Sequence, residues 1–213
     1  MRKIFLIILL TAFLTNVWSQ VERGNVLIKN GTVLTITKGI LEGTDVLVKD
    51  GKISQMAKNI AAPTGTRVID ATGLFVMPGI IDAHSHIGLD VINEGTNAIT
   101  PEVSTADAIN PFQVIIYRAL AGGCTISHAL HGSANSIGGQ SITLKHRYGT
   151  YDPDVMKMEG APRTIKFALG ENPTSHGRRD GLQPQTRMGV EFVIRAAFTE
   201  AKAYDERWNT YNK

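Results

Sequence analysis

Short apolar, β-branched runs separated by turn residues dominate the chain between positions 24 and 70. The runs at 26–28, 32–36 and 45–48 predict strands. Asn30-Gly31 and Asp50-Gly51 follow such runs, and they predict hairpin turns because both residue types tolerate positive φ. We therefore expect a small antiparallel β unit whose role is structural.

Beyond Gly73 the pattern changes to strands that alternate with helices. Asn110 predicts the cap of a helix that begins at Pro111 and runs to Ala121, where Gly122-Gly123 ends it. Extended runs are expected at 74–77, 80–86, 124–129, 141–145 and 164–169. A long helix from about Met188 carries apolar residues at helical spacing, namely Val190, Val193, Ile194, Ala197, Ala201, Tyr204 and Trp208. This order predicts an α/β fold after an all-β start.

The first residues are typical of a targeting segment. Arg2 and Lys3 precede an apolar run from Ile4 to Leu14, and Ser19 offers a small residue for cleavage. We predict a signal peptide over residues 1–19, which implies a secreted or periplasmic protein with no stable membrane anchor after cleavage. An uncleaved anchor is the alternative, although the run is shorter than the ~20 residues of a spanning helix.

Net charge and cysteine usage exclude some classes of protein. The formal charge of +3 falls to +1 without Arg2 and Lys3, and no basic patch indicates a nucleic-acid partner. Cys124 is the only cysteine, so the chain cannot close an internal disulfide and must rely on a packed core. Motifs for nucleotide binding and for serine or thiol catalysis are absent from the sequence.

His84-Ser85-His86 ends an apolar strand and is the strongest chemical signal in the chain. Side chains two positions apart on a strand point to the same side, so both imidazoles are expected to face one space together with Asp82. Burying such groups costs free energy unless a partner satisfies them, and a divalent metal would do so. The alternative is an exposed histidine pair at a strand end.

The surrounding segments resemble a known family. Residues 75–86 resemble the first barrel strand of the amidohydrolase superfamily, and residues 24–33 and 45–53 resemble its small N-terminal β domain. Gly122-Gly123-Cys124-Thr125 is similar to the entry of the second strand. Residues 131–140, 166–173 and 186–190 resemble the imidazolonepropionase-like branch.

This resemblance implies a partial TIM (β/α)₈ barrel preceded by a small β-sandwich-like domain. The expected domains are the signal peptide at 1–19, the β domain at 20–75 and the incomplete barrel at 76–213. It also implies one or two divalent ions, zinc foremost, that activate water to attack the C–N bond of a small amide-like substrate. His84 and His86 take ligand positions, and Lys166 is a candidate carboxylated lysine bridging two ions. A solvated lysine at a strand end is the alternative for Lys166.

Other polar residues could contact substrate or support the ligands. His128, His131, Asn135 and Gln140 are the candidates, and each has the alternative of a buried or loop residue without such a role. Gly138 and Gly139 could belong to a loop over the substrate or to a tight connection that needs positive φ. His176 lies in a polar stretch, 175–181, that we expect to be a solvated loop.

The length of the chain leaves two hypotheses about its function. A full barrel takes about 250 residues, so part of one fits here, and the remaining ligands and the catalytic aspartate are expected beyond Lys213. The first hypothesis is part of a secreted metal-dependent hydrolase. The second is a non-catalytic half-barrel that acts as a structural or partner-dependent binding module. An open sheet edge would also favour homo-oligomers.

Overall fold

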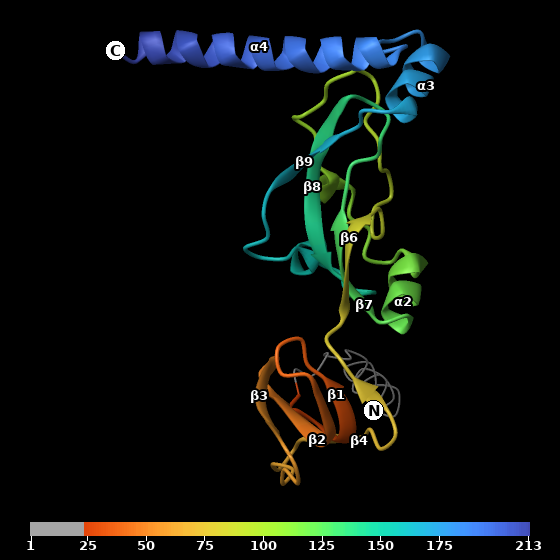
Figure 1. Ribbon diagram of the computed structural model, residues 1–213, viewed down its shortest axis with the longest axis vertical. Helices are drawn as coiled ribbons and strands as arrows, with labels where there is room; N and C mark the ends of the chain where they lie inside the picture. The colour runs from red at the N-terminus through yellow and green to blue at the C-terminus, as the bar shows by residue number, and fades with distance from the viewer. Residues whose placement is uncertain (1–23) are drawn as a thin grey trace, which may run out of the picture. The chain divides into compact units, whose positions relative to one another are not determined.

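The computed structural model describes residues 24–213, and the predicted signal peptide lies outside them. These residues form two compact units that divide between Pro78 and Gly79 (Figure 1). Within residues 24–213, no helix is both long enough and apolar enough to cross a membrane.

The first unit is one five-stranded sheet. Its strands are β1 (Val26–Leu34), β2 (Ile40–Lys49), β3 (Lys52–Ala57), β4 (Arg67–Asp70) and β5 (Phe75–Val76). The order is β3-β2-β1-β4, and β5 also pairs with β1. β2 is antiparallel to both of its neighbours, whereas β4 and β5 run parallel to β1. The predicted antiparallel pairing holds for β1, β2 and β3 but not for β4 and β5, and a sandwich is not confirmed.

The two predicted hairpin turns differ in outcome. Asp50 and Gly51 have φ of 50° and 74° and join β2 to β3, so this hairpin is confirmed. Asn30-Gly31 instead lies inside β1, at an irregularity of the pairing with β2. The buried carboxylate of Asp45 accepts the N–H groups of Asn30 at 2.8 Å and Ile60 at 2.9 Å. The bulge takes the N–H of Asn30 out of the hydrogen-bond ladder between β1 and β2. The Asp45 carboxylate accepts this N–H instead, so β1 continues as a strand beyond Asn30.

The second unit is built on a four-stranded sheet. Its strands are β6 (Ile80–Ser85), β7 (Cys124–Ala129), β8 (Ile137–Lys145) and β9 (Thr164–Phe167), in that order. β6 and β7 are parallel, but β8 is antiparallel to both β7 and β9. The unit is thus an α/β fold with a mixed sheet. An all-parallel barrel segment was expected, and β8 departs from that expectation because the direction of a strand is not encoded in its apolar pattern.

Helices flank this sheet. They are α2 (Val114–Ala121), α3 (Glu171–Asp180) and α4 (Arg187–Tyr211), with short 3₁₀ turns at Thr105–Ala108 and Pro153–Met156. The predicted start of α2 at Pro111 is wrong: the Asn110 side chain accepts the N–H of Phe112 before the helix begins. The stretch 175–181 was expected to be a solvated loop; it is mostly exposed, but 175–180 belongs to α3, and Gly181 caps the helix with φ of 68°.

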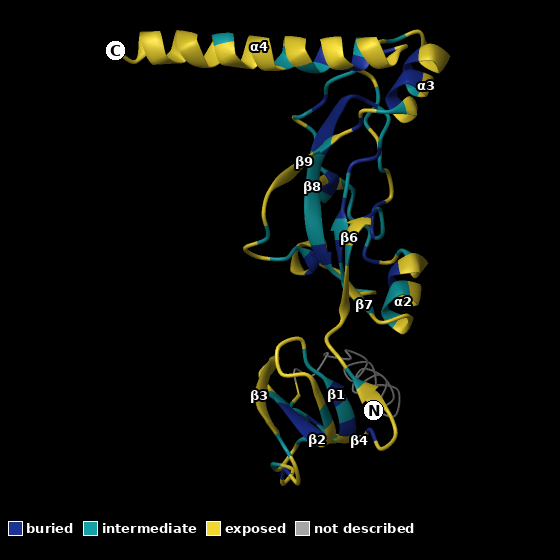
Figure 2. Cartoon of the chain, viewed as in Figure 1, coloured by how far each residue is buried: buried dark blue, intermediate teal, exposed yellow. Residues whose placement is uncertain are grey.

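The core of this unit lies between α2 and the sheet. Leu89, Ile116, Ala129, Leu144 and Met156 pack together and bring α2 against one face of the sheet. We call this the α2 face, and the other side, where His84 lies, the His84 face. Figure 2 shows α4 as mostly exposed. Only Val190 and Val193 of its predicted apolar stripe are buried, while Phe198 stacks on Phe167 of β9.

Candidate metal site

The His84 face brings together the two residues expected to lie closest to a metal. The Nε2 atom of His84, from β6, lies 3.4 Å from the Nζ atom of Lys166, from β9. His84 and His86 are also neighbours, with ring centroids 6.1 Å apart. Nitrogen donors from two separate strands therefore converge at one place, as a metal site requires.

His86 is oriented by a backbone group. Its Nδ1 atom lies 2.8 Å from the carbonyl oxygen of Leu130, which follows β7. A carbonyl oxygen only accepts, so Nδ1 carries the proton and Nε2 of the neutral ring keeps its lone pair. Metal-binding histidines are commonly held in this way, with one ring N–H donated to a carbonyl or carboxylate.

Lys166 has a surrounding that favours its neutral form. The residue is half-buried, and burial lowers the pKa of its amine from the usual 10.5. A neutral amine is needed for the reaction with carbon dioxide that produces a carboxylated lysine. The environment therefore suits the candidate role that the sequence suggested for this side chain.

Asp82 does not join the two histidines. A register shift between Asp82 and Ser85 interrupts the regular alternation that was expected to align the carboxylate with His84. The carboxylate instead accepts the backbone N–H of His84 at 3.1 Å. Asp82 thus shapes the strand that carries His84.

His128 lies on the same face and joins three strands. It pairs with Thr143 across β7 and β8, and its Nδ1 lies 3.0 Å from the Thr143 hydroxyl. Its Nε2 lies 2.8 Å from the hydroxyl of Thr164 on β9, two residues before Lys166. Hydroxyls both donate and accept, so these bonds leave the tautomer of His128 free to follow a ligand. Its place beside the candidate site remains compatible with a substrate contact.

His131 is more deeply enclosed, with 3% of its surface exposed. Its Nδ1 donates to the carbonyl of Gly132 at 2.9 Å, and its Nε2 accepts the N–H of Glu94 at 2.8 Å. Burial lowers the pKa of His131, and the charges of Lys166 and His86 act in the same direction. The Gly132 bond and the charge of Glu94 oppose this change. Backbone groups occupy both ring nitrogens, so the ring has no lone pair free for a metal.

Asn135 and Gln140 also hold backbone segments. The Asn135 amide, in a side chain 1% exposed, donates to the carbonyls of Glu94 and Asn97 and to the Thr100 hydroxyl. Gln140 donates to the carbonyl of Pro101 and accepts from Arg163. Neither side chain is brought to His84 by any of these bonds.

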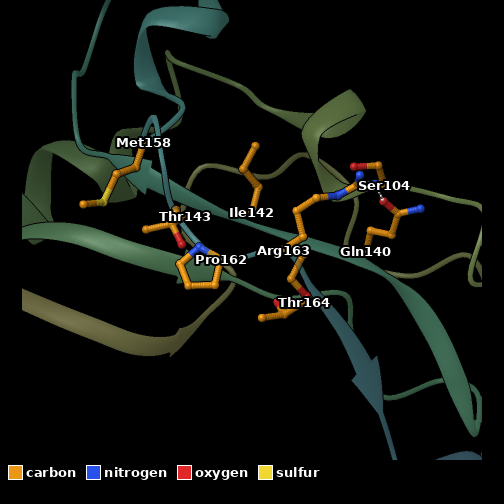
Figure 3. Close-up of a pocket in the computed structure, with 10 residues that line it drawn as sticks. Ser104, Gln140, Ile142, Thr143, Met158, Pro162, Arg163 and Thr164 are labelled. Atoms are coloured by element: carbon orange, nitrogen blue, oxygen red, sulfur yellow. Dashed lines mark hydrogen bonds between the residues drawn. The ribbon is translucent and has the colours of Figure 1, made fainter.

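Gln140 borders a cavity of about 250 Å³ (Figure 3). Ile165, its partner across β8 and β9, alternates with Lys166 along β9. Successive side chains of a strand point to opposite faces, so Gln140 belongs to the α2 face and not to the His84 face. The cavity is also lined by Thr143 and Thr164, the two hydroxyl partners of His128, and neither His84 nor Lys166 is among its lining residues.

Two glycines of β8 have a packing role. A side chain on Gly138 would come within 2.5 Å of His131 Nδ1, and one on Gly139 within 2.9 Å of His131 Cδ2. Neither residue has a positive φ, so the alternative of a tight connection that needs this conformation does not hold. The absence of a side chain at both positions makes room for the His131 ring.

Two further histidines have structural contacts. His146 is buried, with its ring between the Cys124 carbonyl and the Ser127 hydroxyl, each 2.9 Å away. His176 lies on α3 and contacts the Gly95 carbonyl at 3.1 Å. This contact docks α3 on the loop that also binds His131.

The donor set fits a metal ion in part. His84 and His86 supply imidazole nitrogens and Lys166 lies beside His84, but within residues 24–213 no group of three His, Cys, Asp or Glu side chains is arranged to hold an ion. Zinc takes four ligands in structural sites and three protein ligands in catalytic ones. The described residues therefore do not form a complete zinc site by themselves.

Comparisons with known proteins find relatives for part of the chain. No protein-family model matches the chain. An amidohydrolase, tasK, of Hapsidospora irregularis is 36% identical over 157 residues, which are 65% of this chain and 16% of that protein. A dihydroorotase of Geobacter sulfurreducens is 49% identical over 63 residues, 30% of this chain and 15% of that protein.

A solved structure extends the similarity to most of the chain. The crystal structure of an amidohydrolase from Thermotoga maritima matches 86% of this chain and 49% of its own with a TM-score of 0.78 and 39% identity. The chain thus spans about half the length of that structure and about a sixth of the curated relatives. None of these names distinguishes the imidazolonepropionase-like branch, which stays a prediction. Over the part of its length that these relatives cover, the chain belongs to the amidohydrolase superfamily.

Proposed function

We propose that the protein acts as a metal-dependent amidohydrolase that hydrolyses a C–N bond of a small amide or cyclic amide. The observation that carries the proposal is the convergence of His84, His86 and Lys166 on one face of the sheet. Relatives named amidohydrolase and dihydroorotase support the hydrolase class. Secretion through the predicted signal peptide is part of the same proposal.

Each residue has a distinct role in this proposal. His86 presents Nε2 to a divalent ion because Leu130 accepts the proton on Nδ1. His84 contributes a second imidazole, and Lys166, once carboxylated, offers two oxygen ligands for one ion or for a bridge between two. When bound, such an ion lowers the pKa of a water ligand to about 7 and polarises the substrate carbonyl.

The described residues do not supply a complete set of zinc ligands for the proposed reaction. We expect the other metal ligands and the proton-transferring aspartate beyond Lys213, in keeping with the incomplete donor set. His128 is the described residue best placed to contact substrate, because it lies on the His84 face and joins β7 to Thr164. Zinc is the expected ion because imidazole is a good ligand for it.

The test is zinc binding by the purified full chain, measured by calorimetry with and without bicarbonate. We expect one zinc-dependent heat that is lost in His84→Ala and His86→Ala and strengthened by bicarbonate only when Lys166 is present. His176→Ala is the matched control, since His176 contacts Gly95 and not the site. Zinc binding that survives both His84→Ala and His86→Ala would contradict the proposal.

A non-catalytic binding module is the second candidate. It is favoured by the incomplete donor set and by the exposure of His84 together with apolar residues of β6, Ile80 and Ile81. Such a module would bind a partner without turning over an amide. Zinc-dependent hydrolysis of a cyclic amide such as dihydroorotate by the purified protein would exclude this candidate.

A further inference from the structure

His131 follows Leu130, whose backbone contacts the candidate site. Leu130 donates its N–H to the carbonyl of Ser85 at 2.8 Å and accepts the Nδ1 proton of His86 at 2.8 Å. One residue is therefore bonded twice to the His84-Ser85-His86 segment. Loss of the Leu130 carbonyl as an acceptor would remove the contact that favours a proton on Nδ1 of His86.

His131 fixes the chain at this point. Its Nε2 accepts the N–H of Glu94, and the N–H of the next residue, Gly132, donates to the carbonyl of Ile92. The turn that follows β7 is thereby joined to the segment 92–94. Glu94 lies 37 positions before His131 in the chain. Without the Nε2 acceptor, a backbone N–H beside a buried ring would lose its partner.

The packing around the His131 imidazole holds the ring in one orientation. Gly138 and Gly139 lie against opposite parts of the imidazole, and a side chain at either position would overlap it. The ring is also almost fully buried. A close-packed seat with both nitrogens bonded fixes the ring, so it can hold the neighbouring peptide in place.

We propose that His131 is a positioning residue that fixes the Leu130 carbonyl and so keeps His86 in the Nδ1–H form, with Nε2 available to a metal ion. The bond that matters is the one from the Glu94 N–H, because it joins two segments of the chain, whereas the Gly132 bond is local. The metal-binding consequence rests on the proposed function. The effect on the His86 ring does not.

The experiment separates the two bonds of His131 by two amide substitutions. In His131→Gln the side-chain oxygen reaches the position of Nε2 and can accept from Glu94, while in His131→Asn the amide reaches only the position of Nδ1 and can donate to Gly132. His146→Gln is the matched control, because His146 is another buried histidine with both nitrogens bonded. The full chain is labelled with ¹⁵N-histidine, and long-range ¹H–¹⁵N spectra report the tautomer of His86 without metal.

We expect His86 to remain in the Nδ1–H form in the unsubstituted protein, in His131→Gln and in His146→Gln, and to become a mixture in His131→Asn. A His86 tautomer that is unchanged in His131→Asn would overturn the proposal. So would a mixture, or loss of folding, in His131→Gln, because the hydrogen bond would then not be what positions Leu130.

Zinc titration of the same samples separates this inference from the proposed function. His131→Asn should bind zinc about ten- to a hundred-fold more weakly, as substitutions of groups that orient metal ligands do, while His131→Gln keeps most of the affinity. If the unsubstituted protein binds no zinc at His84 and His86, the proposed function fails. The tautomer comparison still decides whether His131 positions Leu130.

Discussion

The Nε2 atom of His84 lies 3.4 Å from the Nζ atom of Lys166, although 82 positions separate the two residues in the chain. β6 and β9 are not neighbours in the sheet, because β7 and β8 lie between them. The contact therefore depends on the curvature of the whole sheet and on long side chains that reach across the His84 face. It links the strongest motif of the sequence to a lysine that no spacing rule connects with it.

Lys166 should titrate below an ordinary lysine. Burial lowers the pKa of its amine from 10.5, so a larger fraction is neutral at any given pH and available to carbon dioxide. ¹³C reductive methylation and NMR titration of the full chain would measure this pKa, with Lys166→Met to identify the resonance. A Lys166 signal that titrates at or above 10.5 would contradict the prediction.

His131 should make stability depend on mildly acidic pH. Burial lowers the folded-state pKa of His131 below its usual value of 6.5, so the unfolded state binds more protons between the two values. The free energy of unfolding should therefore fall as pH decreases through about 6.5, and this loss continues down to the folded-state pKa.

Urea unfolding at pH values from about 7.5 to about 5 would measure the dependence on His131. His131→Gln carries no titrating group and should show a shallower fall of unfolding free energy over this range. Equal slopes for the two proteins would show that other groups cause the pH dependence.

Asp45 should be important for the stability of the β unit. Its carboxylate is 1% exposed and accepts two backbone N–H groups, from Asn30 and Ile60. Asp45→Ala leaves both donors unpaired and should lower the free energy of unfolding by about 1–3 kcal/mol or more. Glu42→Ala, at an exposed position of the same strand, should change it by less than about 0.5 kcal/mol. Equal effects of the two substitutions in urea unfolding would refute this role.

Gly31 is needed because β5 passes close to β1. A side chain on Gly31 would come within 2.7 Å of Val76 Cγ2 and 3.3 Å of the Ala71 side chain. Gly31→Ala should destabilise the protein by about 1–3 kcal/mol through overpacking. Val76→Ala removes the closest methyl, so the double variant should lose less stability than the sum of the two single ones. Strict additivity would mean that the two residues do not press on one another.

The sequence pattern predicts local elements better than their connections. The hairpin at Asp50-Gly51 and the strand at Cys124–Ala129 follow from turn chemistry and apolar runs, and both are confirmed. Asn30-Gly31 carries the same turn signal but lies in a bulge, because Asp45 and β5 act on it from distant parts of the chain. Helix α3 has few apolar residues, and its docking through His176 cannot be read from its composition.

Some residues of the candidate site could be proposed from the sequence, and others required the fold. Alternation on a strand predicts that His84 and His86 face one space, and their ring centroids lie 6.1 Å apart, although β6 ends at Ser85. The role of Lys166 came from resemblance to a family, and its proximity to His84 required the fold. The contact of His86 with Leu130 involves a backbone carbonyl, which is present at every residue and gives no signal in the sequence.

The most direct test of the central claim is a crystal of the full chain soaked in zinc, with diffraction data collected on both sides of the zinc absorption edge. We predict an anomalous peak about 2.0–2.1 Å from a ring nitrogen of both His84 and His86, on the side of Lys166. A zinc-loaded crystal without a peak at these two rings, or with its peak at His128 or His176 instead, would contradict the account.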